Sequence, residues 1–589
     1  MMYPIQVIVL VLLASFYNRF AAQAAPAAST GLVLFRVLLG NLGLCVLVMV
    51  AARWSVRRLY RSSMDSTRAV LRFTRIMNLA RWGSIGLLAW ELWNGGFGPL
   101  VMQRWGLERS IFLPELIFLS VPVLDWFVYW MAQYQVDRAV HQKALPFRLA
   151  MALPVHDLPG LPRYLSLKAR TNLWLLLVEL LIVPTDAFLQ NVGWAKAHAG
   201  AAGLLAMAVD LSTFLLIPWF ITRIWVTAPM ERGPLRDRLE ALAAKFHIRF
   251  LDIRIWKTDH TIQNAMILGP FPFCRYFLLS DALLESLTDE QIEAVFAHEV
   301  GHGHHRHILW YLTGLWGAIL CSTAVASWLR HTFPYITIFH SAQLGQVGLL
   351  AIFLVTVFTF ISRQCEHQAD WFAARYMAQT PAAGRPVMSE GMLQAVMMPD
   401  TLFDDQGVGG WQPVAPFSSV VTGPEIDISR GNFASTARQA RAAGAGQSSA
   451  QGVGQSVGQS GAAGDAQSLR LQRGSAIFSG ALFRIVELSN RTLNKGGAMH
   501  PSPLKRAAFL QNLSRSPREA QRFDRRMWQL RAAIVLFLLL GLALAWYSRT
   551  GAGRTSMAHN PAPGSARQWH PRAAGQIIER NWRTITYYA

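Results

Sequence analysis

The sequence predicts a polytopic α-helical membrane protein that carries one small α+β domain outside the bilayer. Of the 589 residues, 52% are hydrophobic and only 15% are charged, whereas an average soluble protein has roughly 25% charged residues. The apolar residues concentrate in runs long enough to cross a bilayer, which takes about 20 residues as a helix. We expect spans near residues 3–17, 31–52, 83–101, 111–132, 172–192, 203–227, 308–328, 341–362 and 531–547.

Basic residues gather in two of the connections between these spans. The connection 53–82 is rich in arginine, and 133–171 carries further arginines and lysines. Short loops of this kind stay on the cytoplasmic side, so we expect both to face the cytoplasm. The net charge of +21 then needs no nucleic-acid partner, and no stacking or nucleic-acid motif accompanies it. The arginine and alanine bias favours a bacterial inner membrane.

These features divide the chain into six parts. We expect an N-terminal membrane region with about six spans, and a cytoplasmic core that includes a membrane hairpin (308–328 and 341–362). A cytoplasmic insert contains the segment 436–474, which is rich in Gly, Ala, Ser and Gln and therefore predicted to be disordered. A second cytoplasmic piece, a last membrane helix and a polar tail complete the chain. The boundaries are 1–227, 228–380, 381–494, 495–530, 531–547 and 548–589.

The polar stretch 228–307 reads as a small α+β unit. "LRDRLEALAAKFHI" has helical spacing, and "FLDIRIW", "NAMILG" and "YFLLSDALL" have the composition of strands. "LTDEQIEAVFAHEVGHGHH" then starts a helix, with Thr288 as its cap and Gln291 at the third position of a capping box.

This last helix carries a metal-binding pattern, His298-Glu299-x-x-His302. Histidines four residues apart lie on one face of a helix and can hold one Zn²⁺, while the glutamate beside them can act as general base on the attacking water. The pattern alone also fits a solvated helix end. His304, His305 and His307 are expected at the membrane rim, solvated or facing lipid headgroups.

A third ligand is available after the predicted hairpin, in "SRQCEHQADWFAARY". Two spans return the chain to the side it left, so Glu366 emerges beside His298 and His302 and completes a His₂Glu set. Asp370, one turn later, can fix the tautomer of a ligand imidazole. Cys365 points about 100° away from Glu366 on a helix and is not expected to bind.

At these residues the sequence resembles the type-1 CAAX prenyl protease and HtpX group of membrane zinc metallopeptidases, which are gluzincins. The resemblance covers about 228–380 and 495–512, and it includes "HPSPLKR" from His500 to Arg506. It implies a cytoplasmic zincin-like metallopeptidase domain with one Zn²⁺ per chain, bound by His298, His302 and Glu366, with Glu299 as the catalytic base.

The same resemblance implies further roles. His500 and Arg506 would lie near the catalytic cleft, where His500 can stabilise the oxyanion. Asn264 and Ala265 would lie on an edge strand that pairs with the substrate backbone. The expected function is an integral-membrane zinc endopeptidase that hydrolyses peptides or membrane proteins beside the lipid. Two alternatives stay open: an HtpX-like quality-control protease of membrane proteins, and a catalytically silent scaffold or transporter.

Overall fold

The computed structural model describes most of the chain, in two compact units. The described residues are 4–20, 28–61, 66–110, 112–150, 155–174, 176, 193–332, 352, 354–380, 455–488 and 500–557. Unit 1 comprises residues 1–312 and 355–531, and unit 2 comprises 313–354 and 532–589. The metal-binding pattern and the four strands belong to unit 1.

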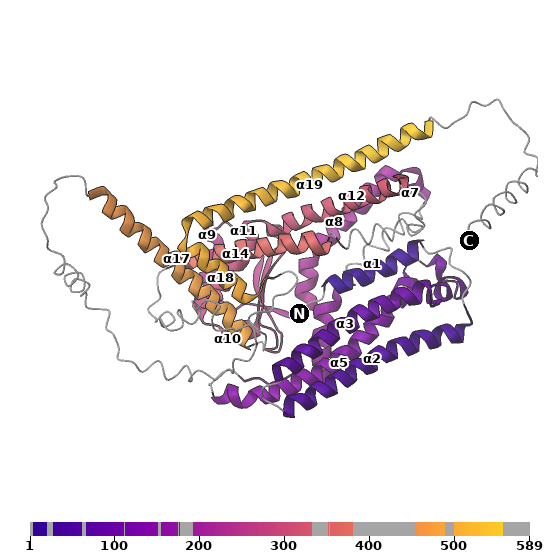
Figure 1. Cartoon of the computed structure of the whole chain (residues 1–589), viewed down its shortest axis with the longest axis horizontal. Helices are drawn as coiled ribbons and strands as arrows, with labels where there is room; N and C mark the ends of the chain where they lie inside the picture. The colour runs from indigo at the N-terminus through magenta and orange to yellow at the C-terminus, as the bar shows by residue number, and fades with distance from the viewer. Residues whose placement is uncertain are drawn as a thin grey trace, which may run out of the picture. The chain divides into compact units, whose positions relative to one another are not determined.

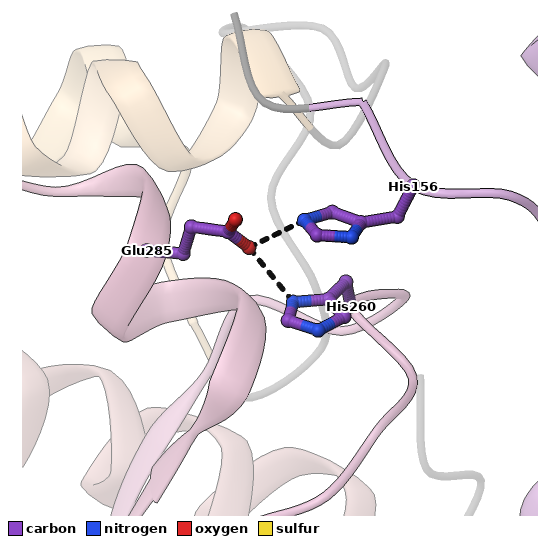
Figure 2. Close-up of side chains that lie close together, drawn as sticks. All are labelled: His156, His260 and Glu285. Carbon is purple, nitrogen blue, oxygen red and sulfur yellow. Dashed lines mark hydrogen bonds and ion pairs between the residues drawn. The ribbon is translucent and has the colours of Figure 1, made fainter.

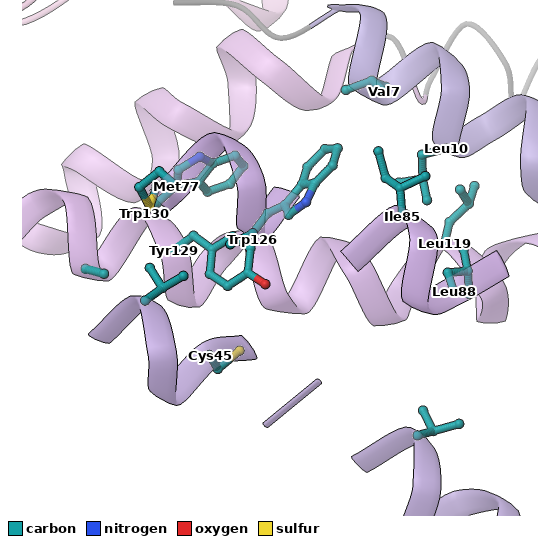
Figure 3. Packing of buried hydrophobic residues seen from close by; sticks show 14 of the residues in the cluster. Val7, Leu10, Cys45, Met77, Ile85, Leu88, Leu119, Trp126, Tyr129 and Trp130 are labelled. Atoms are coloured by element: carbon teal, nitrogen blue, oxygen red, sulfur yellow. The ribbon is translucent and has the colours of Figure 1, made fainter. Parts of the chain in front are cut away.

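The N-terminal helices of unit 1 pack around their own apolar core. They are α1 (Pro4–Phe20), α2 (Thr30–Arg61), α3 (Ser66–Trp93) and α5 (Leu113–Ala150), with the short α4 (Phe97–Pro99), η1 (Leu100–Arg104) and η2 (Leu107–Arg109) between α3 and α5. Trp126, Tyr129 and Trp130 of α5 are almost fully buried in this core (Figure 3). The helix α3 ends before Gly95 and Gly96, where Gly96 adopts the left-handed conformation that L-residues avoid.

Five described helices are long and apolar enough to cross a membrane, judged by length and composition. They are Thr30–Arg61, Leu113–Pro146, Leu204–Ile224, His307–Trp328 and Pro517–Tyr547. They coincide with the spans expected at 31–52, 111–132, 203–227, 308–328 and 531–547. The span expected at 83–101 falls across the end of α3 and its glycine turn. Most of the span expected at 172–192 lies outside the described residues, whereas residues 352 and 354–362 of the span expected at 341–362 are described and helical.

The remaining described helices follow the N-terminal bundle. Residues 161–174 are helical. Further along the chain are α7 (Gly193–Ala197), α8 (Ala199–Ile224), α12 (His307–Thr332), η5 (Leu354–Phe358), α14 (Thr359–Gln379), α17 (Gln455–Leu488), α18 (Pro503–Arg515) and α19 (Pro517–Met557). Within unit 2, α12 and α19 approach closely, because a Cβ at Gly541 would lie 2.9 Å from the Leu320 Cβ. Small residues allow such close contact between apolar helices.

A four-stranded mixed sheet forms the β part of unit 1. Its strands β1 (Thr227–Pro229), β2 (Asp252–Trp256), β3 (Ala265–Leu268) and β4 (Tyr276–Ser280) lie in the order β1-β2-β4-β3. β2 and β4 are parallel, and the outer pairs are antiparallel. The strand order places β3 at an edge of the sheet. The three longer strands confirm the sequence prediction, whereas β1 has only three residues, too few for an alternating pattern.

The two faces of this sheet bury different side chains, as the strand alternation requires. Ile253, Phe277 and Leu279 enter a core shared with the helices α9 (Pro234–Lys245), α10 (Asp281–Ser286) and α11 (Asp289–His304), and with α14, α17 and α18. Trp256 and Leu278 face the other way, toward the end of α8. Figure 1 shows α11, α14, α17 and α18 gathered beside the strands.

The helix α17 corrects the prediction of disorder over 436–474. From Gln455 onward this segment is helical, and the residues before it lie outside the description. The small residues of this segment make close packing possible: Gly474 lies against α14, where a Cβ would come 2.1 Å from the Ala374 carbonyl oxygen. Ile477, Phe478 and Ala481 then continue the helix into the core.

Replacing Gly474 by alanine should push α17 away from α14, because the clash is with backbone atoms that cannot rotate aside. We expect a loss of about 1–3 kcal/mol in stability, seen as a lower thermal unfolding midpoint of the full chain in detergent. Gly86→Ala in α3 is the matched control, since nothing lies within 4 Å of that position. Equal midpoints for the two variants would contradict the close approach.

Candidate metal centre

The helix α11 presents two histidines to one point. It begins with the predicted capping box, in which Thr288 Oγ1 accepts from the Gln291 amide and the Gln291 side chain accepts from the Thr288 amide. Helical spacing then stacks His298 and His302 on one face. Their Nε2 atoms lie 3.1 Å apart. The helix ends at His304, and Arg306 takes a left-handed conformation before α12 starts.

Glu366 of α14 approaches both imidazoles. Its Oε2 lies 3.7 Å from His298 Nε2, and its Oε1 lies 3.5 Å from His302 Nε2. Close packing of the two helices makes this possible, since a Cβ at Gly301 would already press on Phe372 at 3.1 Å. A tetrahedral zinc ion with bonds of about 2.0–2.2 Å holds its ligand atoms roughly 3.3–3.6 Å apart. The three side chains therefore fit one zinc ion.

The other nitrogen of each ligand imidazole also has a partner, which sets the tautomer. His298 Nδ1 lies 2.9 Å from Asp370 Oδ1. His302 Nδ1 lies 2.8 Å from His307 Nδ1, and His307 Nε2 lies 3.1 Å from Gln368 Oε1. A proton on each Nδ1 of His298 and His302 satisfies this arrangement and leaves both Nε2 lone pairs free for a metal. Such outer partners orient metal-binding histidines in general.

His307 corrects the sequence prediction of a solvated rim position. Only 1% of it is exposed, and it connects His302 to Gln368. No sequence pattern indicates this role, because the turn at Arg306 separates His307 from the helical register of α11. His304 is exposed and His305 is half-buried.

Asp370 also anchors a third element. Arg506 of α18 donates to both of its carboxylate oxygens, from Nε to Oδ2 at 2.8 Å and from Nη2 to Oδ1 at 2.5 Å. Asp370 is fully buried. Burial alone would raise the pKa of Asp370, but the Arg506 guanidinium lowers this pKa to about 2. The carboxylate thus stays ionised while it faces His298.

The electrostatics of the cluster suit a cation. Burial and the neighbouring His298 hold the pKa of His302 well below its ordinary value, so its imidazole is neutral. Burial alone would raise the pKa of the Glu366 carboxyl. The nearby histidines, of which His500 has the largest effect, instead keep this pKa well below its usual range. Neutral imidazole and ionised carboxylate are the forms that bind zinc.

Glu299 lies next to this cluster and faces the edge strand. Its Oε2 accepts a hydrogen bond of 2.9 Å from the Ile267 amide of β3. Burial, together with the Glu366 charge, raises the pKa of Glu299 to about 7. A cation at the three ligands would lower this pKa again, because it favours the ionised carboxylate.

The strand β3 offers an open backbone edge at the same place. Asn264 turns its amide and carbonyl toward Ser280 of β4. Alternation in an antiparallel pair then turns the backbone groups of Ala265 and Ile267 to the opposite side, and the Ile267 bond to Glu299 agrees with this. Ala265 therefore has its backbone amide on the side of Glu299, whereas the backbone groups of Asn264 are bonded to Ser280 and only its side chain is available to a ligand.

His500 contacts the ligand set directly. Its Nδ1 lies 2.9 Å from Glu366 Oε2, and 60% of its side chain is exposed. Among the residues expected to act at the site, His298, Glu299, His302, Glu366, Asp370, His500 and Arg506 are therefore all gathered around one point, with Ala265 on the adjoining strand.

Comparison with known proteins finds similarity to peptidases over the part of the chain that carries this site. A model of "Peptidase family M48" matches residues 229–514. The chain is 30% identical over 184 residues to "Probable CAAX prenyl protease 1" of Schizosaccharomyces pombe, covering 29% of this chain and 37% of that protein. It is 25% identical over 214 residues to "Protease HtpX homolog" of Archaeoglobus fulgidus, covering 35% of this chain and 61% of that protein.

A similar protein from Pyrobaculum islandicum, also named "Protease HtpX homolog", is 28% identical over 241 residues, 38% of this chain and 67% of its own length. The crystal structure of S. mikatae Ste24p is matched at 16% identity with a TM-score of 0.28, over 60% of this chain and 89% of that one. Residues 229–514 thus match the model of peptidase family M48, in a chain that also has helices long and apolar enough to cross a membrane; the chain spans 37% and 61% of the length of the first two relatives.

Replacing His307 by alanine should weaken zinc binding by about 10- to 100-fold, because His302 Nδ1 loses the partner that fixes its tautomer. The measurement is zinc affinity of the full chain by competition with a chelating indicator. His304→Ala is the control, since that exposed side chain bonds to none of the three ligands. An unchanged affinity in His307→Ala would refute the positioning role.

Proposed function

We propose that the protein is an integral-membrane zinc-dependent endopeptidase. The main support is that the side chains of His298, His302 and Glu366 lie close enough to bind one ion, with Glu299 next to His298 in the sequence. Three protein ligands leave a fourth position for water or substrate, which distinguishes a catalytic zinc site from a structural one. One zinc ion at this centre completes the catalytic set.

The residues divide the chemistry between them. When bound, zinc supplies Lewis acidity toward water and toward the carbonyl of the scissile bond. Glu299 takes the proton of the attacking water and passes it to the leaving amine. Asp370 holds His298 in the metal-binding tautomer, and Arg506 keeps Asp370 ionised and in place. Arg506 therefore acts through Asp370.

His500 is the remaining candidate for direct contact with the reaction. It touches Glu366 with one nitrogen and exposes much of its ring. An exposed donor at the rim of the ligand set can stabilise the oxyanion that forms at the scissile carbonyl.

The open edge of β3 supports substrate binding by strand addition. Ala265 and Ile267 direct their backbone groups to the side of Glu299, so an extended peptide can pair there with its scissile bond beside the base. The side chain of Asn264 stands at the start of this edge and is proposed to contact the same peptide.

The setting is the surface of a membrane. The catalytic helix α11 leads into α12, which is apolar and long enough to span. We propose that the centre faces the cytoplasm of a bacterial inner membrane, because the arginine-rich connections 53–82 and 133–171 favour that side. The substrates would be peptides or membrane proteins. The similarity to proteins named HtpX favours, as a second candidate, a quality-control protease of membrane proteins.

Glu299→Gln should abolish cleavage while zinc stays bound, with a rate loss of about 100- to 10,000-fold. Glu366→Ala should lose cleavage together with the zinc ion of this centre. The measurements are zinc content of the purified chain and turnover of a fluorogenic peptide library, with Glu519→Gln as the surface control. Full activity in Glu299→Gln would refute the proposed base, and a wild-type chain without zinc or turnover would favour the scaffold alternative.

Ala265→Pro removes one backbone amide from the open edge of β3. The Ala265 amide does not bond to β4, and proline is tolerated in an edge strand at such an outward-facing position. We expect kcat/KM to fall by about 2- to 10-fold, the loss of one net hydrogen bond, with zinc content unchanged. Ala265→Val keeps the amide and is the control. Equal loss in both variants would point to the side chain rather than the strand edge.

A further inference from the structure

A second histidine and glutamate cluster lies in unit 1, apart from the catalytic centre. It consists of His156, from the segment 155–160, His260, from the loop between β2 and β3, and Glu285 of α10. His156 Nε2 lies 2.5 Å and His260 Nδ1 lies 2.8 Å from the same carboxylate atom, Oε2 of Glu285 (Figure 2). Within the described residues, this cluster and the catalytic set are the groups whose ligand atoms lie close enough to share an ion.

We propose that His156, His260 and Glu285 form a second divalent-metal site, which selects Zn²⁺ or a similar transition-metal ion. Two imidazoles and one carboxylate are a nitrogen-rich set that favours such ions over Mg²⁺ or Ca²⁺. A fourth position stays open to water, because each side chain is about one-third exposed: 36%, 35% and 37%.

The distances require only small movements. Zinc would hold these three ligand atoms roughly 3.3–3.6 Å apart, so the carboxylate and the imidazoles must separate by about an ångström or less. The two rings are stacked, with centroids 3.7 Å apart and planes 8° from parallel. They must also turn out of this stack to direct both lone pairs at one ion. Their exposure leaves room for that rotation.

The protein fixes two of the ligands before any ion binds. Asp281, one turn before Glu285 on the same helix, accepts from the amide and hydroxyl of the fully buried Thr258. It also lies 3.4 Å from the His260 amide. The helix α10 thereby does two things: Asp281 positions the loop that contains His260, and Glu285 contacts the His260 imidazole.

The third ligand comes from a distant part of the sequence. His156 precedes the helical residues 161–174, and Arg163 of that stretch pairs with Asp259 at 2.5 Å. An ion bound here would tie the segment before this helix to the peptidase sheet. It would also restrain the loop that leads directly into β3, whose edge faces Glu299.

The test is the zinc content of the full chain in detergent, stripped with a chelator, reloaded with Zn²⁺ and desalted. We expect two zinc ions in the wild type and one each in His156→Ala, His260→Ala and His302→Ala. The double variant His260→Ala/His302→Ala should hold none. His247→Ala, an exposed histidine of the same domain, is the matched control and should hold two. Wild-type zinc content in both His156→Ala and His260→Ala would overturn the proposal.

A second readout guards against variants that fold poorly. In the His302→Ala background, added Zn²⁺ should raise the thermal unfolding midpoint, because an ion that binds only the folded chain stabilises it. That shift should vanish in His156→Ala/His302→Ala, and its persistence there would overturn the second site. The loss of one zinc ion in His302→Ala tests the catalytic centre separately, so failure of either site is recognised independently.

Discussion

The buried carboxylate of Asp370 is the constraint on which the catalytic region depends. It is fully excluded from solvent, and it lies against His298 of α11 and Arg506 of α18. A buried charge without a partner costs several kcal/mol, so α14 is stable only in the orientation that gives Asp370 both partners. Glu366 lies one turn earlier on the same helix, and this orientation therefore presents it to His298 and His302.

Small residues in the histidine motif bring the other components to the centre. Gly301 allows Phe372 of α14 to approach α11, and a Cβ at Gly303 would lie 2.9 Å from the Ile267 side chain of β3. The same strand donates its Ile267 amide to Glu299. Gly301, between the two ligand histidines, thus decides how closely α14 with the third ligand can approach, and Gly303, just after them, decides how closely the strand can approach.

The sequence predicts those parts of the site that depend on local spacing. His298 and His302 follow from their four-residue interval, and the start of α11 follows from the Thr288 and Gln291 capping box, which the structure confirms. The proximity of Glu366 and Asp370 followed from the side on which the chain emerges, together with the family resemblance. Of the described helices, α17 was missed from Gln455 onward because a composition rich in small residues can signal either disorder or close packing.

Contacts across the turn between two helices, or between segments far apart in the sequence, cannot be predicted from helical spacing. His307 follows a left-handed turn at Arg306, so helical spacing does not relate it to His302. His156 and Glu285 are 129 residues apart and share no motif. Only the folded arrangement of three separate segments brings His156, His260 and Glu285 together.

X-ray absorption at the zinc edge can decide whether α11 and α14 hold one zinc ion through two histidines and a carboxylate. The chain should carry His260→Ala, so that the proposed catalytic centre is observed alone. We expect two imidazole nitrogens and further oxygen ligands at about 2.0–2.2 Å. A sulfur ligand at about 2.3 Å, which would implicate Cys365 beside Glu366, or fewer than two imidazoles would contradict it.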